Sequence, residues 1–135
     1  MNPSEAVLDS FALLAFLRGE TGEKKVADLL EKAAESEGSL HMTEVNFAEV
    51  KYITLRKDGP ELWAQVAREL PALPIEFHPA TRSLADTAAD FKARWKLSLA
   101  DAFAAALAKE KGIPLVTGDP EFKALAKEIK VVWIG

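Results

Sequence analysis

The chain has 135 residues, of which 49% are hydrophobic and 28% charged, and its net charge is −4. These values fit one globular domain over residues 1–135 and predict no overall basic field for nucleic acid. The absence of cysteine excludes disulfides, thiol catalysis and thiolate metal sites. No apolar run approaches the roughly 20 residues of a membrane span. Because the N-terminus also lacks the basic region of a signal peptide, we expect a cytoplasmic protein.

The first predicted strand is short and runs directly into a carboxylate. Ala6-Val7-Leu8 precedes Asp9, and the almost wholly apolar stretch 11–17 follows, so we expect a βα unit whose helix is buried on most sides. Periodicity predicts further helices over 23–35, 43–56 and 60–70, with short strands at 40–42 and 75–77.

The second half of the chain continues this alternation. Helices are predicted over 80–95, 97–111 and 121–128, and strands over 113–117 and 131–134. About five short strands among seven helices predict an α/β fold, a three-layer α/β/α sandwich around a mostly parallel sheet.

Two acids directly follow predicted strands. Asp9 comes after the first strand, and Asp119 comes after the strand ending at Thr117. Ligands of parallel α/β sheets bind at the carboxyl ends of the strands, so both acids are candidate site residues. Both also fit helix N-caps, and Asp119-Pro120-Glu121 is a nearly complete helix-start signal. Ser10 fits either a cap or a ligand contact.

Two further acids lie on predicted helices. Glu49 has apolar helical neighbours, and an unpaired buried carboxylate is costly, so either a functional role or pairing with a lysine at the boundary explains it. Asp101 has the spacing of a capping box with Ser98, and the alanine-rich helix that follows allows close packing.

Four carboxylates in one pocket would repel one another unless cations occupied it. His41 and His78 are far apart in sequence and form no ligand motif, so any metal would be held mainly by oxygen. That donor set favours Mg²⁺ or Mn²⁺, ions that support phosphoryl displacement by water.

These motifs, in their order and spacing, resemble the PIN-domain nucleases, specifically the short toxins of the VapC type. The resemblance covers nearly the whole chain and rests on four stretches: Val7-Leu8-Asp9-Ser10, Asn46-Phe47-Ala48-Glu49-Val50, Leu97-Ser98-Leu99-Ala100-Asp101-Ala102 and Leu115-Val116-Thr117-Gly118-Asp119-Pro120-Glu121-Phe122. It implies a Mg²⁺- or Mn²⁺-dependent endoribonuclease with strand order 3-2-1-4-5. By position, the catalytic and metal-binding quartet is Asp9, Glu49, Asp101 and Asp119, with supporting roles for Ser10, Thr117 and Glu121.

The resemblance also implies an RNA substrate, a homodimer and a cognate antitoxin that inserts a segment into the active-site groove. A solvated, charged helix face is the better explanation for any single basic residue, but the local cations that could hold RNA are Lys51, Arg56, Arg82, Lys92, Arg94 and Lys96. Candidate interface residues, each equally readable as core, are Trp63, Phe91 and Trp95.

Three other classes fit the pattern less well. A haloacid-dehalogenase-like phosphatase would need a second acid at position 11, which is Phe11, and a receiver domain would need a lysine after its last strand. An RNA- or protein-binding module without nuclease activity remains the alternative if all four acids are only helix caps. Metal dependence separates that module from the enzyme.

Overall fold

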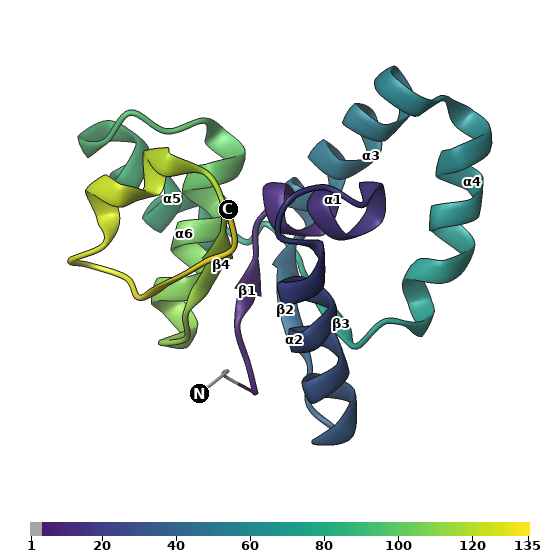
Figure 1. Cartoon of the computed structure of the whole chain (residues 1–135). Helices are drawn as coiled ribbons and strands as arrows, with labels where there is room; N and C mark the ends of the chain where they lie inside the picture. The colour runs from purple at the N-terminus through teal and green to yellow at the C-terminus, as the bar shows by residue number, and fades with distance from the viewer. Residues whose placement is uncertain (1–3) are drawn as a thin grey trace.

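The computed structural model describes residues 4–135 and places a five-stranded parallel sheet between two layers of helices (Figure 1). The strands are β1 (Val7–Leu8), β2 (Leu40–Thr43), β3 (Ile75–His78), β4 (Leu115–Thr117) and β5 (Val131–Trp133). The helices are α1 (Ser10–Arg18), α2 (Glu23–Glu35), α3 (Glu44–Asp58), α4 (Pro60–Glu69), α5 (Arg82–Arg94) and α6 (Leu99–Lys111). The strand order β3-β2-β1-β4-β5 confirms the predicted α/β/α class and topology.

Each face of the sheet has its own apolar core. In Figure 1, α5 and α6 lie on one side of β1 and α1 to α4 lie on the other. Successive residues of a strand point to opposite faces. Accordingly, Leu8 packs into the core with α1 and α2, whereas its neighbour Val7 packs into the core with α5 and α6. The stretch 102–108 of α6 is buried throughout, and its alanines allow this helix to lie close against the sheet.

Side-chain caps begin several helices where the sequence predicts them. Thr43 caps α3 by accepting a hydrogen bond from the backbone N–H of Asn46, and Ser98 caps α6 by accepting one from Asp101. Gly112 ends α6 at φ 65°, in the left-handed region that glycine enters without strain. No helix within residues 4–135 is both long and apolar enough to cross a membrane.

One prediction about local structure was wrong. The last predicted helix, 121–128, is a 3₁₀ helix over Pro120–Leu125, because its buried residues Phe122 and Leu125 are three apart and the three-residue turn places them on one face. The helix α1 is buried on most sides, as predicted, and Phe11 is 41% exposed because it lies on the side of α1 that faces the groove described below. Phe91 is fully buried, so its core interpretation holds and it offers no exposed surface.

Candidate active site

The site lies where the carboxyl ends of β1 and β4 meet at the centre of the sheet. These strands pair in parallel, with Val7 opposite Leu115 and Leu8 opposite Val116. The backbone N–H of Asp9 continues the ladder by donating to the carbonyl of Val116. The residues that follow the two strands therefore leave the same edge side by side, as the sequence predicts for Asp9 and Asp119.

Asp9 is buried at the floor of the site. Its Oδ1 accepts a hydrogen bond of 2.8 Å from the backbone N–H of Ala12, which makes it the N-cap of α1, and its Oδ2 accepts one from the Thr117 hydroxyl. Burial raises the pKa of Asp9 to about 8, and the nearby charges of Asp101 and Asp119 add to the shift, while both hydrogen bonds oppose it. Capping thus occupies one oxygen of Asp9 and explains neither its burial nor its raised pKa.

A chain of hydrogen bonds orients the acids after β4. The Thr117 hydroxyl oxygen accepts a bond of 3.0 Å from the backbone N–H of Asp119, and Asp119 Oδ1 accepts one of 2.9 Å from the N–H of Glu121. Thr117 therefore contacts both Asp9 and Asp119, which is a specific reason for a hydroxyl at this position. Asp119 is half-buried and Glu121 is exposed.

Asp101 projects from the first turn of α6. The Ser98 hydroxyl accepts from its backbone N–H at 3.1 Å, leaving the Asp101 carboxylate to face the groove. The pKa of Asp101 is raised to about 6, first by partial burial and then by the charges of Asp119, Glu49 and Glu121, against the hydrogen bond from Ser98. The fold therefore brings Asp101 within electrostatic reach of three other acids.

Glu49 completes the group from α3, whose position is fixed by Asn46. The buried Asn46 amide donates to the Ser10 hydroxyl and to the carbonyl of Ala100, both at 3.1 Å, and its oxygen accepts from the Thr43 hydroxyl. Ser10 in turn donates to the carbonyl of Asn46 at 3.3 Å. This network joins α1, α3 and α6, the three helices that carry acids of the site or follow them.

Sequence reasoning gave Asn46 no role of its own. The available signal was an amide between apolar residues, three positions after the cap residue Thr43. Ser10, by contrast, was predicted as a supporting residue, and the structure places its hydroxyl in this network and at the wall of the groove.

The side chains converge on an open groove of about 330 Å³. Its lining residues are Ser10, Phe11, Leu14, Glu49, Ile53, Ser98, Asp101, Asp119 and Glu121. One carboxylate oxygen each from Asp101, Asp119 and Glu121 lie within 4.8 Å of one another, close enough to share a metal ion. Glu49 also lines the groove, and the buried Asp9 lies within electrostatic reach of Asp101 and Asp119, so the predicted quartet gathers around one place and Glu121 joins it.

The cluster has no basic partner within residues 4–135. None of the ion pairs there includes Asp9, Glu49, Asp101, Asp119 or Glu121. Nor does any lysine or arginine line the groove. Oxygen-only donors suit a hard divalent cation, and such an ion would offset the mutual repulsion that contributes to the raised pKa values of Asp9 and Asp101. The donor set therefore fits Mg²⁺ or Mn²⁺.

The predicted RNA-binding cations have other contacts or lie on exposed surface. Arg94 forms an ion pair with Glu128 at 3.0 Å, and Lys92 donates to the carbonyl of Leu97 at 2.9 Å. Lys51 and Arg56 lie over the rings of Trp63 and Tyr52.

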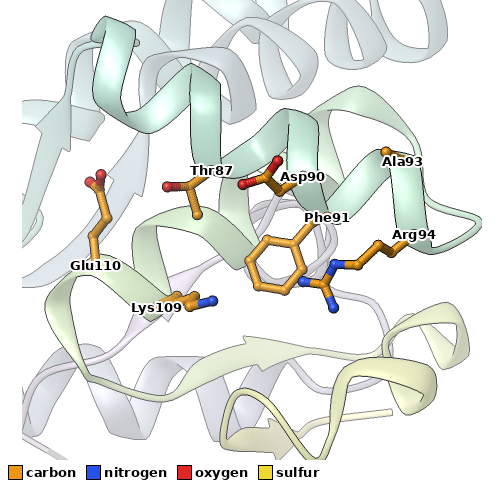
Figure 2. A pocket seen from close by; sticks show the side chains of 7 residues that line it. All are labelled: Thr87, Asp90, Phe91, Ala93, Arg94, Lys109 and Glu110. Atoms are coloured by element: carbon orange, nitrogen blue, oxygen red, sulfur yellow. The ribbon is translucent and has the colours of Figure 1, made fainter.

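A larger pocket, of about 470 Å³, lies between α5 and α6 (Figure 2). Its centre is the Phe91 ring, with the Arg94 guanidinium 5.4 Å and the Lys109 ammonium 5.5 Å from the ring centroid. None of the predicted site residues lines it. Its size alone does not make it the functional site, because neither group of possible metal ligands found within residues 4–135 lies there, and its acids Asp90 and Glu110 share the lining with Arg94 and Lys109.

Fold and site together define a class: a doubly wound α/β domain with a cluster of unpaired carboxylates at its central crevice. The chain belongs to the PIN domain family, whose model matches residues 6–128. No curated protein sequence matches it.

Solved structures share the fold at low sequence identity. DNA-bound VapBC from Salmonella typhimurium aligns over 100% of both chains at 15% identity with a TM-score of 0.75. VapC20 of Mycobacterium tuberculosis, a toxin that cleaves the sarcin–ricin loop, aligns over 89% of this chain and 94% of its own at 18% identity and TM-score 0.72. VapBC2 from Rickettsia felis, bound to a DNA fragment from its promoter, aligns over 95% and 97% at 12% identity and TM-score 0.72.

Proposed function

We propose that this protein is a Mg²⁺- or Mn²⁺-dependent endoribonuclease and the toxin of a toxin–antitoxin pair. The observation that carries the proposal is the carboxylate cluster, which lines an open groove without any basic partner in the described part of the chain. Membership of the PIN family supports the nuclease chemistry. Similar structures, which include toxin–antitoxin complexes and a toxin that cleaves the sarcin–ricin loop, support the substrate and the partner.

In this proposal, the quartet of Asp9, Glu49, Asp101 and Asp119 holds the metal, directly or through water, and Glu121 assists at the exposed rim. A bound divalent ion supplies activation of water and stabilisation of the charge that develops on the phosphate. Asp9 contributes a buried negative charge at the floor once a cation lowers its pKa.

The remaining polar groups of the site position the acids. Thr117 fixes the spacing between Asp9 and Asp119 through its two hydrogen bonds, and Ser98 holds the backbone from which Asp101 projects. Asn46 and Ser10 hold α3, and with it Glu49, against α1 and α6. No side chain is needed as the nucleophile, because the attacking group is water.

The partners follow from the same proposal. RNA enters the groove as a single strand or loop, whose unstacked bases can approach a surface that duplexes cannot. A segment of the cognate antitoxin occupies the same groove, and the toxin acts in the cytoplasm as a homodimer. Exposed apolar residues available for these contacts include Phe11 at the groove and Leu99, which is 54% exposed, at the start of α6.

The test is cleavage of a structured RNA pool in Mg²⁺ or Mn²⁺, with EDTA as the metal-free condition. Asp101→Asn and Glu49→Gln should lose cleavage while keeping the fold by circular dichroism. Glu44→Gln, a matched change one turn earlier on α3 at an exposed position, should cut like the wild type. Cutting that survives EDTA, or Asp101→Asn, would contradict the proposed site.

The alternative is a binding module whose acids serve only as caps. Asp9 and Asp119 do cap helices, which is the observation that favours it. Asparagine caps helices as well as aspartate does, so Asp119→Asn separates the two functions. Unchanged stability together with a large loss of Mn²⁺ affinity in this variant supports the enzyme. Unchanged Mn²⁺ affinity supports the module.

A further inference from the structure

A second cluster of possible metal ligands lies across β2 and β3, outside the carboxylate groove. Its members are His41 on β2 and both Glu76 and His78 on β3. The parallel register places His41 opposite Glu76 and Thr43 opposite His78. Because side chains two residues apart on a strand share a face, all three side chains project from the same face of the sheet. The prediction that the two histidines form no ligand motif is therefore corrected by the strand pairing.

The ligand atoms of this cluster are close together. His41 Nδ1 lies 2.9 Å from His78 Nε2 and 3.5 Å from Glu76 Oε2, and His78 Nε2 lies 4.0 Å from the same carboxylate oxygen. A tetrahedral zinc-type ion with ligand bonds of about 2.0–2.1 Å separates its ligands by about 3.3–3.4 Å. The three measured distances lie on both sides of that value, so side-chain adjustments of about half an ångström would close the site.

A carboxylate behind His41 sets the orientation of its ring. Glu5 Oε1 lies 2.8 Å from His41 Nε2, so this nitrogen carries the proton and the lone pair of Nδ1 points toward His78 and Glu76. A carboxylate that accepts from the outer nitrogen of a ligating histidine is the usual support of a metal site. His41 is only 2% exposed, which holds the ring in place.

Counting protons exposes an imbalance in the cluster. If both rings are neutral, His78 donates its single Nε2 proton to His41 Nδ1, and the Glu76 oxygen then faces two nitrogens without any proton directed at it. The two ring nitrogens and the Glu76 oxygen thus lie close together with only one proton among them.

We propose that His41, Glu76 and His78 bind one divalent transition-metal ion of the Zn²⁺, Co²⁺ or Ni²⁺ class, with Glu5 orienting His41. Two imidazoles and one carboxylate are the donors that these ions prefer, whereas Mg²⁺ prefers oxygen alone. The fourth position is left to water, since Glu76 is on the exposed side of the cluster. The ion would join β3, which is the edge strand of the sheet, to β2, and the hydrogen bond between His41 and Glu5 would connect the residues before β1 to the cluster.

The nearby charges favour a cation overall. Glu5 and Glu76 bring two carboxylates to the cluster, and Lys111 at the end of α6 is the lysine whose charge reaches Glu5 and His78. This site is independent of the proposed nuclease function, because the two sites share no residue and this one includes nitrogen ligands.

The test is a Co²⁺ titration of the untagged full chain, followed by visible absorption, with excess Mg²⁺ present to occupy the carboxylate groove. Co²⁺ held in a tetrahedral site with nitrogen ligands absorbs strongly, and an octahedral all-oxygen site absorbs weakly. We expect one equivalent to give the strong band, one equivalent of Zn²⁺ to abolish it, and Zn²⁺ to raise the melting temperature. His78→Gln and Glu76→Gln should each lose the band, and Glu5→Gln should weaken binding about 10–100-fold.

Two controls make the result decisive. Asp101→Asn changes the carboxylate groove and should keep the absorption band, which separates this site from the nuclease proposal. Glu44→Gln changes an exposed acid outside both sites and should also keep the band. No band in the wild type overturns the proposal. A band that persists in both His78→Gln and Glu76→Gln also overturns it, because the ion is then held by other residues.

Discussion

Replacing Asp9 by asparagine should stabilise the metal-free protein at neutral and alkaline pH. The native carboxyl has a pKa of about 8 against 3.8 for the ordinary group, because it is buried beside Asp101 and Asp119. Between these values the native state holds a proton that the unfolded state has lost, so the free energy of unfolding falls as the pH rises. Asparagine has no proton to lose and can still accept from Ala12 and donate to Thr117.

The magnitude follows from the pKa gap. Each unit corresponds to about 1.4 kcal/mol, and over the window from pH 5 to pH 8 the wild type should lose about 3–4 kcal/mol that Asp9→Asn does not lose. Other titrating groups are common to both proteins, so the difference between the two pH profiles isolates Asp9. The nearly complete burial of Asp9 is the main cause of this loss of stability, and water that entered the site would make the loss smaller.

The assay is urea denaturation of both proteins in EDTA at intervals from pH 5 to pH 8. Repetition in Mn²⁺ should raise the stability of the wild type more than that of Asp9→Asn, since only the wild type has a buried carboxylate whose charge the cation offsets. If the difference in stability between the two proteins is the same at pH 5 and pH 8, Asp9 is not held protonated. The electrostatic reasoning about the groove would then fail.

Three further substitutions test the packing around the site. Asn46→Ala should cost about 2–4 kcal/mol in urea denaturation because it leaves buried partners on three segments without hydrogen bonds, and a cost under about 1 kcal/mol would show that the network is not structural. Gly118→Ala should cost about 1–3 kcal/mol, since a Cβ there would lie 2.3 Å from Phe11 Cε1, and Phe11→Ala should recover most of that loss if the contact is the cause. Thr54→Val should be neutral or stabilise α3 by about 1 kcal/mol, because the buried hydroxyl has no hydrogen-bond partner within residues 4–135, and a clear loss of stability would contradict this.

The acidic residues of the candidate site could be predicted because their positions, directly after strands or on helices, can be recognised from a few neighbouring residues. Asp9 and Asp119 follow β1 and β4 directly, and the periodicity of each helix places Glu49 and Asp101 near the ends that face the crevice. Their capping bonds were predictable for the same reason, since a cap depends on residues three positions apart. The closeness of Glu121 to Asp101 was not predictable, because it depends on the tight 3₁₀ helix after Asp119.

Sequence alone therefore determined the fold class, the order of its elements and the acids that could form a site. These properties depend on patterns over a few residues, where helix and strand periods and caps act. The tertiary structure alone decided which distant groups meet: Asn46 with Ala100, and His41 with His78. Such contacts depend on strand register and on how closely helices pack, and a shift of one residue in β3 would turn His78 to the opposite face of the sheet. No local pattern specifies that register, because the packing of the whole sheet selects it.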